Sequence, residues 1–314
     1  MTGPFSLLAH APRVITEGSL VERLHRRADL PLDPHIAHAA FIYAAAGRAA
    51  LEEIYRRYLD VGRDHRLPIV VFAPTWRASA DRLRRAGWGA DKDVNGDGVR
   101  FVQAIRETYG DCASRIIVGA LLACAGNAYD PSEALGDAEA SRVHRPQADR
   151  LAAAGPDFLM AATLPAASEA LGLARAMAAT RTPYLLSFVL RGDGTLLDGT
   201  PLSAAIGRVD GEVDPAPAGY MINCVHPDVC AAALDREPAG RRRVWGLQAN
   251  TSPRSPEELD RSAATETEDP ERFADGMVRL HERFGLRILG GCCGTDERHI
   301  GRLAERLTAL GGGT

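Results

Sequence analysis

Short apolar runs recur eight times along this chain, and each is followed by a stretch of helix-forming residues. The runs are continuous rather than alternating, which is typical of parallel strands that are covered on both faces. They span residues 13–17, 68–73, 116–123, 158–163, 184–190, 220–224, 244–249 and 287–292. The helical segments between them include residues 138–154, 167–179, 270–284 and 296–310.

Eight strand–helix units in 314 residues predict an α/β fold of the (β/α)8 TIM-barrel type, formed by one domain over residues 1–314. A doubly wound open sheet is the alternative. That fold needs a glycine-rich phosphate loop after its first strand, and the loop is missing here. Two helix starts carry capping signals, Ser168 before Glu169 and Thr295 before Asp296.

The composition indicates an ordinary globular protein, with 25% charged and 46% hydrophobic residues. A net charge of −4 gives no basic field for nucleic acid or an anionic membrane. The dense basic run Arg241–Arg243 is interpreted as a solvated loop. No stretch is apolar enough to span a bilayer, and the N-terminus lacks a secretion signal, so we expect a cytoplasmic protein with reduced thiols.

Three cysteines stand where apolar runs end. Cys224 ends the sixth run, and the adjacent Cys292 and Cys293 end the eighth, with glycines on both sides of the pair. Glycine lets the backbone turn sharply or approach a ligand closely, which a plain core strand does not need. In a barrel the carboxyl ends of all strands share one rim, where active sites form. The pattern therefore predicts a Zn²⁺ site with three thiolate ligands and one open position, as in catalytic zinc sites.

A lone buried cysteine is more often a small packing residue than a ligand. Cys112, Cys124 and Cys230 lack the glycine setting, and we assign them to packing. Glu17 ends the first run, where a carboxylate at an apolar barrel mouth needs a cationic partner. A substrate ammonium group and a neighbouring arginine both satisfy that need.

Two further patterns are interpreted as structural. Residues 91–96 match the opening of a calcium-binding EF-hand loop, but Val102 stands where the bidentate glutamate belongs. We interpret that segment as a turn before a helix. His35 and His38 are three residues apart and could share a helix face, but with three thiols available they are assigned structural roles.

With these residues identified, the chain resembles the zinc-dependent homocysteine S-methyltransferase family over almost its full length. The most specific match is the Gly-Gly-Cys-Cys-Gly segment at 290–294, with Asn223 and Cys224 as its partner. Residues 74–79, 163–170 and 248–251 resemble the ends of the family's second, fourth and seventh strands.

The resemblance implies roles for individual residues. Cys224, Cys292 and Cys293 are implied as zinc ligands, and Glu17 and Asn223 as catalytic residues. Thr75, Thr163 and Asn250 are implied, together with Glu17, as substrate-binding residues.

The chain departs from the family at two carboxylates that help hold the amino group of homocysteine. The usual Asp-Gly-Gly turn is Thr16-Glu17-Gly18 here, and Ala162 replaces the glutamate before the fourth-strand threonine. Metal chemistry is therefore better supported than the identity of the acceptor, although Glu17 is placed to take over part of the lost role.

The implied reaction moves a methyl group from a small onium donor to the zinc-bound thiolate of homocysteine, giving methionine. The donor is of the S-methylmethionine, S-adenosylmethionine or betaine type, because no extra domain is seen for cobalamin or folate. Trp76, Tyr129 and Trp245 could cradle the cation on their ring faces. The alternatives are another thiol or selenol acceptor, or a non-catalytic descendant that binds zinc or a metabolite. A homo-oligomer is compatible with the sequence.

Overall fold

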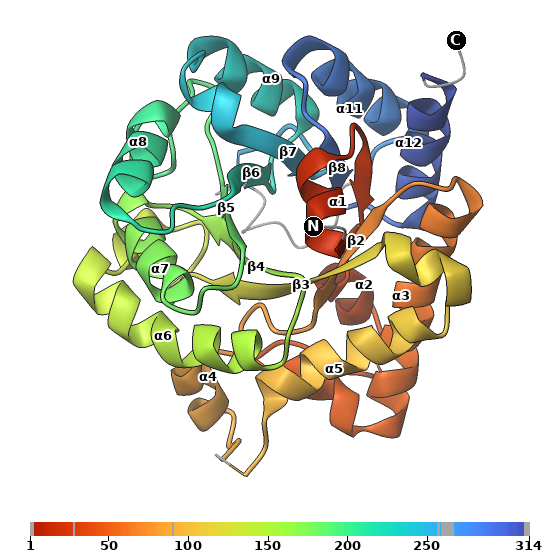
Figure 1. Cartoon of the computed structure of the whole chain (residues 1–314), viewed down its shortest axis with the longest axis vertical. Helices are drawn as coiled ribbons and strands as arrows, with labels where there is room; N and C mark the ends of the chain where they lie inside the picture. The colour runs from red at the N-terminus through yellow and green to blue at the C-terminus, as the bar shows by residue number, and fades with distance from the viewer. Residues whose placement is uncertain (1–2, 28, 90, 256–257, 259–266, 311–314) are drawn as a thin grey trace.

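The protein forms a closed barrel of eight parallel strands in the order β1 to β8 (Figure 1). It is described from a computed structural model, which covers residues 3–27, 29–89, 91–255, 258 and 267–310. The strands are β1 Val14–Thr16, β2 Ile69–Ala73, β3 Ile116–Ala123, β4 Phe158–Leu164, β5 Tyr184–Phe188, β6 Gly219–Asn223, β7 Val244–Ala249 and β8 Ile288–Gly291. Pairing of β1 with β8, in the register Val14 to Ile288, closes the barrel. Every predicted apolar run overlaps one of these strands to within one residue at the strand's ends or contains it, so the predicted barrel is confirmed.

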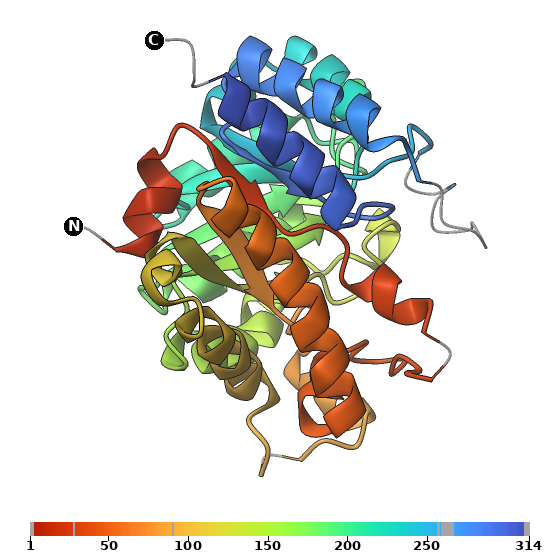
Figure 2. The same cartoon turned by 90° about the vertical axis from the view of Figure 1, so that its right-hand side faces the viewer.

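Helices surround the barrel and connect successive strands (Figures 1 and 2). They are α1 Pro4–His10, α2 Val21–His25, α3 Ala45–Asp64, α4 Ala80–Arg85, α5 Val94–Glu107, α6 Asp137–Ala153, α7 Ala167–Ala178, α8 Leu202–Glu212, α9 Pro227–Arg236, α11 Pro270–Phe284 and α12 Glu297–Ala309. Short 3-10 helices lie at Ala39–Tyr43, Gly110–Arg115, Pro131–Glu133 and Gly240–Arg243. The four helical segments expected from the sequence match α6, α7, α11 and α12.

Both helices begin close to their predicted start signals, but neither Ser168 nor Thr295 is the capping residue. Ser168 lies inside α7, whose N-cap is Ala166, and its hydroxyl donates to the carbonyl of Leu135 instead. Asp296, not Thr295, caps α12, where it forms a reciprocal capping box with His299. A tertiary hydrogen bond occupies the hydroxyl of Ser168. At Thr295, the neighbouring Asp296 is the better acceptor for the backbone N–H groups at the helix start.

Two segments interpreted as a turn and a solvated loop, residues 91–96 and Arg241–Arg243, can be compared with the structure. The EF-hand-like segment ends in a helix start, as expected, because the Asp93 side chain caps α5 by accepting from Gly96 N. The arginine run is less solvated than expected. Arg243 forms an ion pair with Asp210 at 2.9 Å and lies over the ring of Tyr220.

The interior of the barrel is apolar at its amino-terminal end, and α1 closes that end (Figures 1 and 2). Leu8 of α1 is fully buried in a cluster with inward-facing strand residues such as Val14, Phe72, Phe158 and Ile288. Towards the carboxyl ends of the strands, buried polar side chains such as Glu17, Asn223 and Gln248 join the apolar ones. The amino-terminal end of the barrel therefore contributes packing, and the carboxyl-terminal end is where an active site is expected.

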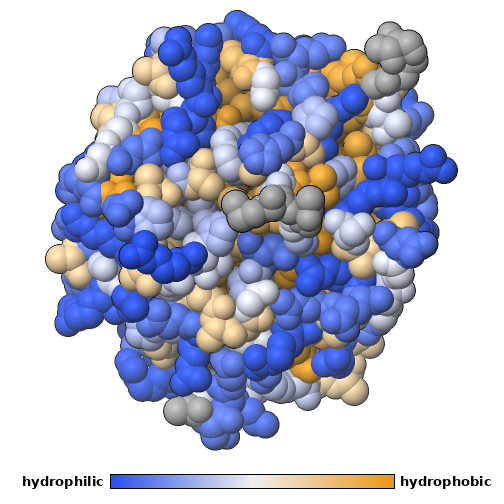
Figure 3. Space-filling view, in the orientation of Figure 1, coloured by the Kyte–Doolittle hydropathy of each residue, from blue (hydrophilic) through white to orange (hydrophobic). Residues whose placement is uncertain are grey.

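The face that carries α1 is predominantly hydrophilic, with apolar residues showing between the charged ones (Figure 3). Within the described part of the chain, no helix combines the length and the apolar character that crossing a bilayer requires.

Candidate active site at the carboxyl ends of the strands

A cavity of about 350 Å³ lies at the carboxyl ends of the strands. Strand ends and the loops after them supply its walls, and all three cysteines predicted as ligands line it. The lining residues are Glu17, Gly18, Ser19, Leu20, Val21, Glu22, His25, Leu32, His38, Phe72, Ala73, Trp76, Leu121, Tyr129, Ala162, Thr163, Asn223, Cys224, Gln248, Gly291, Cys292 and Cys293. The prediction that residues distant in sequence meet at one rim is therefore confirmed.

The three predicted ligand cysteines converge in this cavity. The Sγ atoms of Cys224, Cys292 and Cys293 all lie within 4.8 Å of one another. Cys224 is buried, Cys292 is partly buried and Cys293 has the most exposed surface of the three. Three sulfurs on adjoining strand ends can hold one metal ion between them.

Local backbone geometry explains why the cysteines sit in a glycine-rich segment. A side chain at Gly290 would collide with Thr16 on β1, so glycine allows β8 to pack closely there. Gly294 has a φ of 82°, which turns the chain sharply after the cysteine pair. Cys224 itself has a φ of 56°, a conformation that non-glycine residues rarely adopt and that concentrates at functional sites.

The Sγ atoms of Cys224 and Cys292 are in direct contact, with Cα atoms 5.6 Å apart. Convergence of the two strand ends brings these sulfurs into contact. A metal ligand must be a thiolate, so these cysteines bind a metal in their reduced form. Cys293 remains a free thiol.

The electrostatics at Cys293 disfavour the charged thiolate when no cation is bound. Desolvation raises the pKa of its thiol to about 11, and the nearby Glu22 carboxylate adds to that rise. A hydrogen bond from Tyr129 opposes it. A divalent cation between the sulfurs would reverse the balance, because a coordinated thiol is deprotonated.

Glu17 is a buried carboxylate in the cavity wall, with 5% of its surface exposed. Its Oε2 accepts a hydrogen bond from Phe72 N at 3.1 Å. Burial raises the pKa of this carboxyl well above its usual value, and only the Phe72 hydrogen bond counteracts it. Among the described residues no arginine or lysine forms an ion pair with Glu17. Of the two partners considered from the sequence, this favours the ammonium group of a ligand.

Asn223 and Thr163 form one hydrogen-bonded unit in the wall of the cavity. The Asn223 Oδ1 accepts from Thr163 N at 2.9 Å and from Ser187 Oγ at 2.6 Å, while its Nδ2 donates to Thr163 Oγ1 at 2.7 Å. Thr163 has a φ of 61°, at an irregularity in the pairing of β4. The amide of Asn223 therefore holds the end of β4 in an unusual conformation, which suits a positioning role.

Three other residues singled out from the sequence lie outside the cavity lining. Thr75 is fully buried and exchanges hydrogen bonds with Leu121 N and O on β3. Asn250 donates to the Cys224 carbonyl at 3.1 Å, so it supports a cysteine from behind. Trp245 stands near the start of β7, where Arg287 lies over its ring, and it cannot reach a donor at the opposite end of the barrel.

Aromatic residues form part of the cavity wall, as expected for Trp76 and Tyr129. The indole nitrogen of Trp76 is buried without a hydrogen-bond partner in the described structure. Ring faces in such a wall can attract an onium cation.

His38, assigned a structural role from the sequence, lines the cavity as well. It is 4% exposed, and desolvation lowers its pKa to about 4, so it is neutral near pH 7. Its Nδ1 has no partner among the described residues. Its position in a long excursion between β1 and α3 gave no periodic signal from which this could be predicted.

The donor set fits a thiophilic metal such as zinc. Three thiolates are soft ligands, and a site with three protein ligands and room for one more is the arrangement of catalytic zinc. The cavity in front of the sulfurs supplies that room.

Comparison with known proteins agrees with this geometry. A family model described as homocysteine S-methyltransferase matches residues 14–307. A homocysteine S-methyltransferase of Escherichia coli K12 is 29% identical over 231 residues, covering 68% of this chain and 71% of that protein. Betaine–homocysteine S-methyltransferase 1 of Bos taurus is 24% identical over 94% of this chain and 72% of its own length. The metallated form of the homocysteine methyltransferase MmuM from Escherichia coli shares the fold, with a TM-score of 0.78 at 22% identity over 97% of this chain and 100% of that one.

Proposed function

Because the chain belongs to the homocysteine S-methyltransferase family, we propose that it methylates homocysteine to methionine, using zinc and a small onium donor. The observation that supports this most directly is the convergence of Cys224, Cys292 and Cys293 beside the buried carboxylate of Glu17, in one cavity. A thiol-bearing amino acid has the two groups that such a cavity complements, a thiol for the three-cysteine site and an ammonium group for Glu17.

The three cysteines would hold the zinc ion between them. When bound, zinc supplies the positive charge that lowers the pKa of an acceptor thiol from about 8.5, so that the acceptor reacts as a thiolate. Glu17 binds the acceptor's ammonium group and so fixes where its sulfur lies. Asn223 keeps the end of β4 in place beside it.

The transfer step needs positioning rather than a protein base. The acceptor sulfur forms a bond to the methyl carbon while the carbon–sulfonium or carbon–ammonium bond of the donor breaks. The bonding electrons leave with the donor, which departs as a neutral thioether or tertiary amine. Trp76 and Tyr129 present ring faces to the donor cation, and alignment of the reacting atoms supplies much of the rate.

The size of the cavity favours a compact donor. Ligand sites commonly measure about 300–1,000 Å³, and this one, at about 350 Å³, lies at the small end. It suits an amino-acid-sized acceptor with a small sulfonium or betaine donor better than a nucleoside-bearing one.

A different acceptor is the second candidate, and Ala162 is the observation that favours it. Ala162 lines the cavity where the resemblance places a glutamate, so this wall offers a methyl group in place of a carboxylate. A thiol or selenol without an α-amino group would lose less binding free energy from that replacement, because it has no ammonium group for the missing carboxylate to bind.

The deciding experiment is a zinc-loaded assay of reduced protein with homocysteine and a panel of sulfonium and betaine donors, analysed for methionine. Cys224→Ser, Cys292→Ser and Cys293→Ser should each lose metal and activity while the barrel stays folded. Cys112→Ser is the matched control, because Cys112 lies outside the cavity. Unchanged metal content in all three site variants would overturn the assignment.

Binding can also be followed without turnover. A thiol arrives protonated at neutral pH, so binding as a thiolate should release close to one proton per acceptor. Calorimetry in buffers of different ionisation enthalpy counts that proton. Binding of homocysteine with no proton release would contradict the proposed thiolate.

A further inference from the structure

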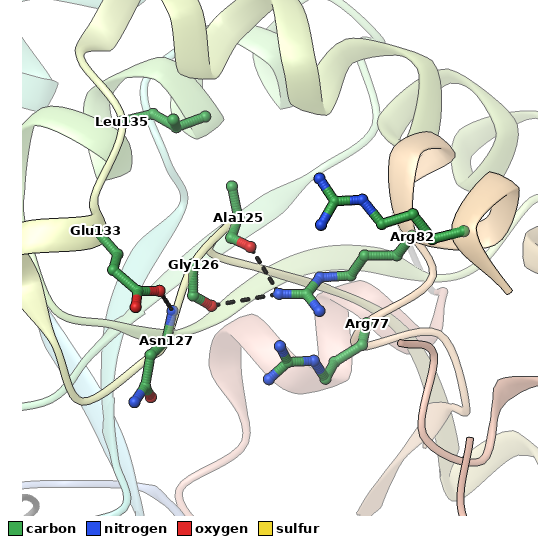
Figure 4. A pocket seen from close by; sticks show the side chains of 8 residues that line it. Arg77, Arg82, Ala125, Gly126, Asn127, Glu133 and Leu135 are labelled. Carbon is green, nitrogen blue, oxygen red and sulfur yellow. Dashed lines mark hydrogen bonds between the residues drawn. The ribbon is translucent and has the colours of Figure 1, made fainter. Parts of the chain in front are cut away.

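A second hollow, of about 590 Å³, lies among the loops that follow β2 and β3 (Figure 4). We call it the arginine pocket. Its lining consists of Arg77, Arg82, Arg85, Ala125, Gly126, Asn127, Glu133 and Leu135. Three guanidinium groups in one hollow are unusual in a chain whose net charge is −4.

Arg77 has no anionic partner in the described structure. Neither a hydrogen bond nor an ion pair joins it to any described residue, and its buried Nε is unpartnered. Its guanidinium lies over the ring of Trp76, whose centroid is 5.4 Å from the guanidinium carbon. Burial lowers the pKa of Arg77, and its electrostatic interactions with Cys124 and Glu133 offset that effect only in part.

Arg82 points into the same hollow and bonds only to carbonyl oxygens (Figure 4). It donates to Ala125 O at 2.6 Å, to Gly126 O at 3.4 Å and to His35 O at 3.3 Å. Burial lowers its pKa, and the positive charge of Arg77 lowers it further. Arg85 differs, because it pairs with Asp81 at 2.7 Å.

The acidic residue in the lining, Glu133, acts on Arg77 only at a distance, and its attraction does not outweigh the effect of burial. The Glu133 carboxylate accepts a hydrogen bond from Asn127 N at 2.7 Å, and within the described residues it forms no ion pair with Arg77 or Arg82. A purely structural role accounts for Arg82, which braces the loop at Ala125 and Gly126. The same role does not account for Arg77, because its burial has a desolvation cost and its side chain holds no loop in place by a described hydrogen bond.

The arginine pocket adjoins the methyl-transfer cavity. Trp76 lines that cavity while the next residue, Arg77, lines the arginine pocket. The loop after β3 does the same, with Asn127 on one side and Tyr129 on the other. A group held by the arginines therefore lies next to the aromatic wall at which an onium cation would bind.

From this geometry we propose that the arginine pocket is a binding site for a compact oxyanion, a carboxylate or a phosphate, held chiefly by Arg77 with Arg82. Guanidinium groups match the two oxygens of such anions, and a ligand there would supply the missing counter-charge. The carboxylate end of an onium donor is one source of this anion, and this assignment of the source rests on the proposed function. Free phosphate is the other.

The first test measures binding alone, so its outcome does not depend on methyl transfer. Inorganic phosphate and acetate are titrated into the full-length protein and followed by calorimetry. Arg77→Gln should weaken binding at least about tenfold, as expected for the loss of one charged hydrogen-bonding partner. Arg77→Lys should restore part of it. Arg150→Gln, which changes an exposed arginine on α6 with no described ion pair, should bind like the parent.

The second test identifies the source. If the donor supplies the anion, Arg77→Gln raises the KM for a betaine or S-methylmethionine but not for trimethylsulfonium, which has no carboxylate. If the anion is separate, phosphate binds without competing with the donor. The proposal fails if the parent binds neither anion and its donor KM is unaffected by Arg77→Gln, or if the variant binds as tightly as the parent. An inactive protein that still binds phosphate through Arg77 would overturn the proposed function and leave this site standing.

Discussion

Removing the carboxylate of Glu169 should destabilise the protein substantially, although this residue lies outside the cavity. Glu169 is fully buried at the start of α7. Its Oε1 accepts from Ala125 N at 2.7 Å and contacts His144 Nε2 at 2.8 Å, while its Oε2 accepts from Leu135 N at 3.3 Å. One carboxylate thus ties down both ends of the loop that carries Tyr129 and lines the arginine pocket.

The size of the effect follows from the donors left behind. Glu169→Ala leaves three groups without their acceptor, and each buried orphan costs about 1–3 kcal/mol. Water can reach the loop once it loosens, which relieves part of that cost. Three such groups sum to about 3–9 kcal/mol, and we expect a loss in the lower half of that range, about 3–6 kcal/mol in the free energy of unfolding. Glu169→Gln keeps one acceptor oxygen and should lose about 1–3 kcal/mol.

Denaturant unfolding of the reduced protein measures these losses, and hydrogen exchange at Ala125 and Leu135 shows whether the loop opens first. Glu139→Ala is the matched control, because Glu139 is an exposed carboxylate on α6, and its removal should stay within about 0.5 kcal/mol of the parent. The reasoning is refuted if Glu169→Ala unfolds within about 1 kcal/mol of the parent.

Four further outcomes are expected. Glu17→Gln should raise the KM for homocysteine more than it lowers kcat, because uniform binding of the ammonium group is lost; an unchanged KM would contradict that contact. Because burial raises the pKa of Glu17, the ionised carboxyl weakens the fold as pH rises through that pKa. The Gln variant should therefore be the more stable protein at pH 7, with the difference vanishing below about pH 4, and thermal unfolding across pH checks this sign. Asn223→Ala should cost about 2–3 kcal/mol by freeing Thr163 and its neighbours, and equilibrium unfolding that shows no loss would contradict it. Gly290→Ala should collide with Thr16, push β8 from β1 and lower zinc affinity, and a variant that binds zinc like the parent would show that the strand can adjust.

The barrel could be predicted from the sequence because its strands are buried on both faces. That burial makes each strand a continuous apolar run, and β2, with five buried residues, is typical. Strand order then placed Cys224 near Cys292 and Cys293, since all carboxyl ends of barrel strands share one rim. Both inferences depend on patterns that survive in a one-dimensional sequence.

The surroundings of other residues depend on contacts between distant segments, which the sequence pattern does not report. Thr75 ends a strand, as a substrate-binding residue would, but its hydroxyl is occupied by the backbone of β3. Trp245 is aromatic and near a strand, but it lies at the wrong end of that strand. His38 was missed because its place in the cavity is set by how a long loop folds back, and nothing in its neighbours reports that.

The position of α1 has a kinetic consequence. Since Leu8 and its neighbours fill the amino-terminal end of the barrel, ligands do not pass through the molecule. Both substrates must enter, and both products leave, by the mouth at the carboxyl ends of the strands. A cavity of this kind imposes a sequence of events: whichever ligand occupies the deeper position has to arrive before its companion and depart after it. Steady-state kinetics should accordingly show an ordered addition of substrates through a ternary complex. The substrate that binds second should slow the release of the substrate that bound first.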